Sequence, residues 1–263
     1  MRHGNVAAFH PDGHEHEVSP TAETSPTIVL VHGAWHGAWA WDPIVPLLRA
    51  QGLRTRAVHL PGVGRAPGRH DLAGHAAFLR AALAEVDGPA AVCAHSYGGA
   101  VATEAAAAPN VTALVYLAAF QLEPGESCVD ANKPARAPAS SDTAPPDPSL
   151  AAVREGDYLY VSEAAARHMF YGGCTEEQTI RAAARITPEH VRTVAAPVTR
   201  AAWHDIPSTY VVCLRDQAIP AQAQRAMAER AAARVEIDTA HSPMLSHPAE
   251  LTAVLAAAVR RDG

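Results

Sequence analysis

The sequence predicts an α/β protein: a mostly parallel, doubly wound sheet with helices on both faces and a helical cap inserted into the chain. Three observations lead to this prediction. Short apolar runs alternate with segments of helical periodicity over residues 27–120 and again over residues 208–263, which is typical of parallel strands joined by helices. Residues 121–207 interrupt the alternation and contain no clear strand. The length of 263 residues and a hydrophobic fraction of 48% suffice for one domain with a full core.

Six short apolar runs are the predicted strands, as expected for a sheet that helices cover. In chain order they are Thr27–His32, Arg54–Leu60, Pro89–His95, Thr112–Phe120, Ser208–Leu214 and Arg234–Asp238. Helical apolar spacing predicts the segments that follow them, which are Trp39–Ala50, Asp71–Val86, Tyr97–Ala108, Ala221–Ala232 and Pro248–Arg260. Asp71 is the expected N-cap of the second of these helices.

The chain is expected to divide into three parts. Residues 1–26 are polar and rich in His, Pro and Glu, which predicts a flexible, solvated tail. Residues 27–120 and 208–263 form the core domain, and residues 121–207 form the cap. Binding sites of open α/β sheets lie at the carboxyl ends of the strands, where we expect the cap to sit. Within the cap we expect a loop over Pro134–Pro148 and helical segments over Leu150–Arg154, Glu163–Tyr171, Thr175–Ile186 and Pro188–Ala195.

Charge and composition exclude several classes of protein. The net charge is −6 and no dense run of Lys or Arg occurs, so nucleic acid and membrane surfaces are not expected partners. The four cysteines form no C-x-x-C pair, and no apolar stretch reaches the roughly 18 residues of a membrane-spanning helix. The N-terminus lacks the apolar segment of a signal peptide, so a cytoplasmic protein is expected. The sequence leaves open whether the protein is a monomer or a homodimer.

The strongest candidate for a catalytic residue is Ser96. It stands in the segment Ala94–Gly99 (AHSYGG), directly after an apolar strand and before a helix. A G-x-S-x-G turn between a strand and a helix lifts a serine oxygen clear of the sheet as a nucleophile, and small residues on either side allow the tight turn. Here Ala94 replaces the first glycine, which adds one methyl group, while Gly98 and Gly99 fit the pattern.

Two backbone N–H groups are the expected oxyanion hole. Acyl transfer requires such donors, aimed at the negative charge that develops on the substrate carbonyl. One is expected from Tyr97, the residue after the nucleophile. The other is expected from Ala34, within the sequence His32–Trp35 (HGAW) that follows the first strand.

A general base and a carboxylate complete the predicted site. His241 follows the last strand and precedes the last helix, so it is placed to reach the serine. In this arrangement the chain order is Ser, acid, His, and Asp216 after the fifth predicted strand fits that order. Asp238 and Glu123 stay open as alternatives for the acid, whereas Asp205 precedes its strand and lies at the wrong end of the sheet.

Five motifs then occur in the order of a known superfamily. They are His32–Trp39 (HGAWHGAW), His59–Gly64 (HLPGVG), Ala94–Gly99 (AHSYGG), Arg215–Pro220 (RDQAIP) and His241–Pro248 (HSPMLSHP). With them the chain resembles the α/β-hydrolase superfamily, and more narrowly the branch of bacterial esterases, plant methyl-ester esterases and hydroxynitrile lyases. The resemblance implies the α/β-hydrolase fold, and ester cleavage that requires no metal and no organic cofactor.

Two positions separate the reactions of that branch. Its lyases have Thr where this chain has Gly33 and Lys where it has Ser242, and those groups handle the cyanohydrin and the cyanide. A carboxylic ester hydrolase acting through an acyl-enzyme is therefore favoured. A lyase or other C–C or C–X cleaving enzyme, and a non-catalytic small-molecule receptor, stay as alternatives.

The expected substrate is a small, apolar or aromatic ester. This expectation rests on large apolar side chains in and near the cap, although such residues also commonly pack a cap onto a sheet. The residues expected to contact the substrate are Gly33, Tyr158, Phe170, Trp203 and Met244.

Overall fold

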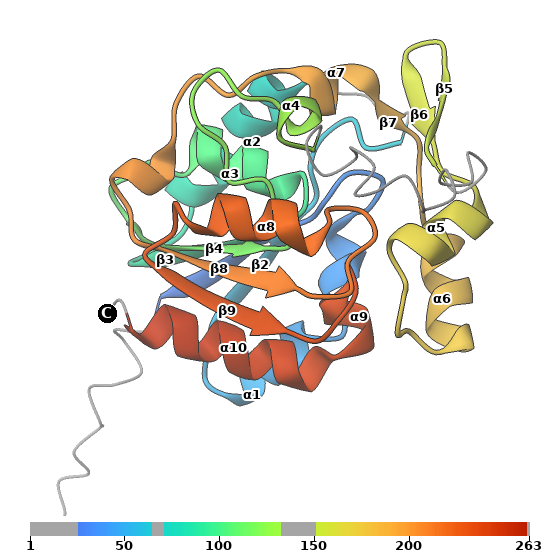
Figure 1. The fold of residues 1–263 in the computed structure, drawn as a ribbon. Coiled ribbons are helices and arrows are strands. Elements are labelled where there is room, and N and C mark those ends of the chain that lie inside the picture. Colours follow the sequence, from blue (N-terminus) through green and yellow to red (C-terminus); the bar gives the residue numbers. More distant parts are fainter. Residues whose placement is uncertain (1–25, 65–70, 133–150, 262–263) are drawn as a thin grey trace, which may run out of the picture.

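A computed structural model describes residues 26–64, 71–132 and 151–261, and it contains the predicted parallel sheet (Figure 1). The strand order is β2-β1-β3-β4-β8-β9, and each pair of neighbours is parallel. All six predicted strands are present, as β1 (Thr27–Val31), β2 (Thr55–Val58), β3 (Ala90–His95), β4 (Val111–Leu117), β8 (Ser208–Cys213) and β9 (Ala233–Ile237). The predicted loop Pro134–Pro148 and all but the last residue of the predicted tail lie outside the described residues.

Both faces of the sheet are covered by helices, as the sequence predicts. Val29 and Val31 of β1 point into one apolar cluster, while Ile28 and Leu30 point into the other. In Figure 1 the first face carries α2 (Leu72–Ala84), α3 (Gly98–Ala105) and α8 (Ala221–Ala228), and the second carries α1 (Val45–Ala50) and α10 (Pro248–Arg261). The doubly wound α/β prediction is confirmed. No helix in the described ranges combines the length and apolar character required to cross a bilayer.

The ends of two helices follow from single residues. The predicted N-cap of α2 is present, because Asp71 accepts a hydrogen bond from the backbone N–H of Gly74 at 2.7 Å. The helix predicted over Trp39–Ala50 is wrong in its first half, which is a 3-10 turn, η2 (Ala38–Trp41), followed by α1. Pro46 lies in the first turn of α1, where its missing N–H leaves no hydrogen bond unmade, so α1 begins there.

The described residues between β4 and β8 are here called the cap. Residues 153–183 of the cap lie beyond the carboxyl ends of the strands, whereas residues 196–207 run back beside α3 to the start of β8 (Figure 1). The helices are α4 (Cys128–Asn132), α5 (Glu163–Met169), α6 (Glu176–Ala183), α7 (Val191–Ala195) and the 3-10 turn η5 (Ala202–His204). A small antiparallel sheet joins them, formed by β5 (Val153–Glu155), β6 (Tyr158–Tyr160) and β7 (Glu189–His190). The limits of 121 and 207 given above for the cap stay a prediction.

The small sheet corrects the prediction of a helix over Leu150–Arg154. Val153 and Arg154 belong to β5, which pairs with β6 across the two-residue turn Gly156-Asp157. Gly156 has a φ of 60°, a conformation that glycine adopts without strain and that two-residue hairpins require. The hairpin turn therefore outweighed the weak helical preference of the preceding alanines.

The turn from β3 into α3 brings the start of a helix close to the backbone of the sheet. A Cβ on Gly98 would lie 2.7 Å from the carbonyl oxygen of His32 and 2.8 Å from that of Val31. Both neighbours are backbone atoms, so no side chain can move aside. Gly98 thus lets α3 start directly against the end of β1.

We predict that Gly98→Ala destabilises the protein by about 1–3 kcal/mol or prevents folding, because the added methyl group must displace backbone. Urea unfolding followed by circular dichroism measures the loss. A midpoint equal to that of the wild type would contradict the close approach.

Candidate active site

The candidate site lies at the carboxyl edge of the sheet, where loops following β1, β3, β8 and β9 meet. Ser96 follows β3 directly, Asp216 follows β8 and His241 follows β9. Each of these loops leaves a strand at the same edge, because all strands of the sheet run in parallel. The fold therefore brings together residues that are up to 145 positions apart.

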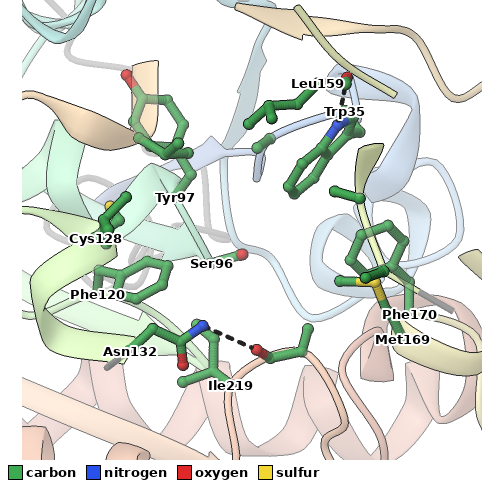
Figure 2. Close-up of a pocket in the computed structure, with 16 residues that line it drawn as sticks. Trp35, Ser96, Tyr97, Phe120, Cys128, Asn132, Leu159, Met169, Phe170 and Ile219 are labelled. Atoms are coloured by element: carbon green, nitrogen blue, oxygen red, sulfur yellow. Dashed lines mark hydrogen bonds between the residues drawn. The ribbon is translucent and has the colours of Figure 1, made fainter. Parts of the chain in front are cut away.

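Ser96 sits in a strained turn. Its φ of 54° is in the left-handed region, which a residue with a Cβ adopts only when its surroundings impose it. The backbone N–H of Ser96 donates to the carbonyl of Leu117 at 3.3 Å, and its carbonyl accepts from Gly99 at 3.0 Å and from Phe120 at 3.1 Å. These bonds hold the turn between β3 and α3, and the serine hydroxyl points into a cavity (Figure 2).

Asp216 and His241 form a buried pair. Oδ2 of Asp216 accepts from Nδ1 of His241 at 2.7 Å, and both side chains are almost fully buried. Oδ2 also accepts from Gln224, while Oδ1 accepts from the backbone N–H groups of Ala218 and Ile219. The carboxylate thus uses all of its hydrogen-bonding capacity. With its proton held on Nδ1, His241 presents a lone pair on Nε2, which is what a general base requires.

His95 fixes the backbone of His241. Its Nε2–H donates to the carbonyl of His241 at 2.8 Å, and the two rings lie with centroids 4.6 Å apart. Ser96 Oγ and His241 Nε2 do not hydrogen-bond directly in the described part of the chain. Such bonds are often long without substrate and tighten in the reacting complex, so the arrangement is compatible with proton transfer.

His32 orients the loop that follows β1. The backbone N–H of Leu60 donates to Nε2 of His32 at 3.1 Å, so Nδ1 carries the proton and donates to the carbonyl of Gly33 at 2.8 Å. The C=O and N–H of a trans peptide point in opposite directions, so this bond turns the N–H of Ala34 away from His32. Ala34 and Tyr97 line the same cavity as Ser96.

Gly33 and Tyr97 are also tightly held. A Cβ at position 33 would lie 2.8 Å from Cβ of Ser96, so the loop and the nucleophile turn are in direct contact. The hydroxyl of Tyr97 hydrogen-bonds Nδ1 of His75 at 2.8 Å, and Nε2 of His75 bonds the carbonyl of Pro61 at 2.9 Å. Buried imidazoles therefore contact both expected oxyanion residues: His32 holds the backbone before Ala34, and His75 holds the side chain of Tyr97.

Burial keeps three histidines beside the site neutral. It lowers the pKa of His32 to about 3 and that of His36 to about 4, and it holds the pKa of His95 well below its usual range. Repulsion between neighbouring imidazoles, which acts when both are protonated, lowers the pKa values further. His36, like His32, donates from Nδ1 and accepts at Nε2, an arrangement that only the neutral ring allows.

The cavity over Ser96 has a volume of about 310 Å³ and an apolar wall. Figure 2 shows the serine hydroxyl between two groups of side chains. One group consists of Phe120, Cys128, Asn132 and Ile219, and the other of Trp35, Leu159, Met169 and Phe170. No Lys, Arg, Asp or Glu belongs to the described lining. Nor do the described residues contain a group of three or more His, Cys, Asp or Glu placed to hold a metal ion.

The sequence pattern described as the alpha/beta hydrolase family matches residues 28–254. The chain belongs to this family. A pyrethroid hydrolase of Sphingobium wenxiniae is 29% identical over 87% of this chain and 86% of its own, and methylesterase 7 of Arabidopsis thaliana is 27% identical over 86% and 94%. The crystal structure of polyneuridine aldehyde esterase superposes with a TM-score of 0.73 at 22% identity, covering 89% of this chain and 98% of the other, and so shows the same fold.

The residues expected to contact substrate in this hydrolase fall into two groups. Phe170 lines the cavity, and Gly33 lies against Ser96 at its edge. The other three do not belong to the described lining. Met244 is buried in the apolar cluster under α10, Trp203 packs on the opposite cluster and donates to the carbonyl of Leu122, and Tyr158 stacks edge-on against His190.

Several residues that line the cavity of the hydrolase were given no role by sequence reasoning. Trp35 and Ile219 stand inside two of the quoted motifs, so position in the motif was the signal that was available. Asn132 and Cys128 come from α4, in a segment without a motif. Their approach to Ser96 depends on how the cap folds back, which no local pattern encodes.

The alternative acids lie apart from His241. Asp238 is 74% exposed and pairs with Arg215 at 3.0 Å. Glu123 pairs with His204 at 3.0 Å, and Asp205 is exposed at the end of η5. Among these candidates only Asp216 contacts the imidazole.

We predict that Asp216→Asn lowers kcat by roughly 10³–10⁴-fold. The amide can donate to Nδ1 of His241, which places the ring proton on Nε2 and removes the base. Steady-state kinetics on an activated ester measures the loss. Asp238→Asn is the matched control at the same edge of the sheet, and its kcat should stay within about threefold of the wild type. Equal losses in both variants would contradict the assignment.

We also predict a pH-dependent stability. Because the folded pKa values of His32 and His36 lie below the unfolded value of 6.5, the unfolded chain binds more protons as the pH falls. The stabilisation is complete above pH 6.5 and is lost progressively toward pH 4 and below. Urea unfolding from about pH 7 to pH 5 should show a falling free energy of unfolding, since most carboxylates stay ionised there.

The variant that tests this dependence is His36→Gln, which should reduce the slope. His168→Gln, in an exposed position on α5, should leave the slope unchanged. A free energy of unfolding that is constant between these pH values would show that the buried imidazoles do not destabilise the fold on protonation.

Proposed function

We propose that this hydrolase cleaves small, uncharged esters with apolar or aromatic groups through an acyl-enzyme on Ser96. The observation that carries the proposal is the position of the Ser96 hydroxyl, which opens into an apolar cavity beside the buried Asp216–His241 pair. At the level of reaction class the chain is a carboxylic ester hydrolase, in keeping with relatives that are named as hydrolases and methylesterases.

In the proposed first step Nε2 of His241 takes the proton of Ser96 as Oγ attacks the ester carbonyl. The oxygen that becomes negative is stabilised by the backbone N–H groups of Ala34 and Tyr97. Asp216 holds the imidazole in the required tautomer and stabilises the imidazolium. His241 then gives its proton to the leaving alcohol, and the same residue activates the water that releases the acid.

The cavity supports the substrate class. Its described wall holds no charged group to pair with a carboxylate or an ammonium, so a charged substrate would lose its hydration without compensation. A volume of about 310 Å³ is at the lower end of the range for small-molecule pockets, which favours compact esters. The aromatic rings of Trp35 and Phe170 offer faces against which a flat group can pack.

The groups of the lyases in this superfamily have no counterpart here. A threonine at position 33 would bring its Cβ within 2.8 Å of Ser96 Cβ unless the loop moved. Ser242 is buried, and its short hydroxyl side chain carries no charge in place of a lysine. Both features favour ester hydrolysis over cyanohydrin cleavage.

We predict that the purified protein hydrolyses p-nitrophenyl esters from acetate to octanoate and that Ser96→Ala loses at least about 10³-fold in kcat. The acyl-chain length that gives the highest kcat/KM then measures how long an acyl group the cavity accepts. Ser246→Ala, a serine outside the site, is the control and should retain wild-type kinetics. A folded wild type that is inactive on every ester would refute the proposal, and full activity of Ser96→Ala would remove Ser96 from it.

A further inference from the structure

Trp35, the residue after the proposed oxyanion donor Ala34, is tied to the cap by every polar group it has. Its backbone N–H donates to Oε2 of Glu189 at 3.1 Å, and its carbonyl accepts from the N–H of Thr187 at 3.0 Å. Its indole N–H donates to the carbonyl of Leu159 at 3.1 Å, the dashed line beside Trp35 in Figure 2. The loop that carries the oxyanion donor is thus bonded to β6, β7 and the residues next to them.

The conformation of Trp35 requires such support. Its φ of 61° lies in the left-handed region, which is disfavoured for a bulky aromatic residue. A strained residue of this kind persists only where surrounding contacts impose it, and it commonly marks a functional site. Without the bonds from the cap, relaxation of Trp35 would rotate the peptide between Ala34 and Trp35, and the N–H of Ala34 would move with it.

The same peptide is held at its other end as well. Nδ1 of His36 donates to the carbonyl of Ala34 at 2.8 Å, and the hydroxyl of Tyr171 donates to Nε2 of His36 at 3.1 Å. Tyr171 follows α5, so this second connection also leads into the cap. In the preceding peptide, the carbonyl of Gly33 accepts from Nδ1 of His32 at 2.8 Å and from the backbone N–H of His36 at 3.4 Å.

Glu189 is the cap side chain that bonds the backbone of this loop at Trp35, within the described residues. It is 5% exposed and belongs to β7. Oε2 accepts the Trp35 N–H, while Oε1 accepts the hydroxyl of Thr193 in α7 at 2.8 Å. The carboxylate therefore links the oxyanion loop to a helix of the cap, with one oxygen for each.

We propose that Glu189 is a positioning residue for the oxyanion hole, so that the cap completes the catalytic apparatus as well as covering the cavity. The inference rests on the proposed function, because it assigns the role of Glu189 through the N–H of Ala34. Glu189 touches no reacting atom and acts through Trp35. Its loss should therefore weaken transition-state stabilisation more than substrate binding.

The test compares Glu189→Met, which keeps the size and removes both acceptors, with Glu189→Gln, whose amide oxygen can still accept the Trp35 N–H. We expect Glu189→Met to lower kcat by about 10- to 100-fold on a p-nitrophenyl ester, with KM changed by less than about threefold. Glu189→Gln should recover most of the activity. Glu104→Ala is the matched control, since Glu104 is a comparably buried carboxylate that bonds Thr199 and does not reach the oxyanion loop.

A pair of inhibitors separates positioning from general destabilisation. Ser96 Oγ adds to the carbonyl carbon of butyl trifluoromethyl ketone and its proton passes to His241, which leaves a hemiketal oxyanion in the proposed hole. The matching carbinol binds the cavity without forming the bond. In Glu189→Met the inhibition constant of the ketone should rise by about the same factor as kcat falls, and that of the carbinol by less than about threefold. Glu104→Ala should change neither constant.

The outcomes distinguish this inference from the proposed function. If the wild type hydrolyses esters, Ser96→Ala does not and Glu189→Met matches the wild type in kcat and ketone binding, the role of Glu189 is refuted and the esterase stands. Equal rises in the inhibition constants of the ketone and the carbinol in Glu189→Met would also refute the role of Glu189. A wild type without ester turnover refutes both. If Glu189→Met does not fold, Thr193→Val replaces it in the test. Thr193→Val removes the hydroxyl that bonds Oε1 of Glu189. This variant should also lower kcat more than it changes KM, by a smaller factor than Glu189→Met.

Discussion

The site depends on one turn, in which β3 ends and α3 begins around a residue held at positive φ. For the turn to exist, α3 must approach the backbone of β1 and of the segment after β4, and glycines at positions 98 and 99 leave the space. The turn exposes the hydroxyl of Ser96 and places the N–H of Tyr97 at the start of a helix, where negative charge is favoured. Ala94 shows that one methyl group is accepted before the serine, inside β3, where the chain is still extended.

Neutral imidazoles form the second support of the site. His32, His36 and His95 are buried, and each donates a hydrogen bond to a backbone carbonyl of a loop at the carboxyl edge. An imidazole suits this task because one ring offers a donor and an acceptor in fixed directions. An amide offers the same groups on a more flexible side chain. The high histidine content of the sequence is thus partly explained by backbone support.

The sequence predicted the sheet and the serine–histidine–aspartate arrangement because each depends on local signals, namely apolar runs and residues directly after them. Chain order then distinguished Asp216 from Asp238, and the contact with His241 agrees with that choice. The cap could not be predicted in the same way. Its hairpin depends on the turn Gly156-Asp157, and its contribution to the cavity depends on tertiary packing. Leu159 bonds Trp35 across 124 positions, a pairing that no periodicity reveals.

The parallel pairing of β4 with β8 determines where the chain can change in length. Leu117 at the end of β4 lies opposite Val211 of β8, so two neighbouring strands of the sheet pair directly although the whole cap separates them in sequence. The entropy lost on closing a loop grows only with the logarithm of its length, about 0.6 kcal/mol for each doubling. Residues can therefore be gained or lost between these two strands at small cost to folding. The cap is the part of the chain where new specificities can arise while the sheet and the turn at Ser96 stay the same.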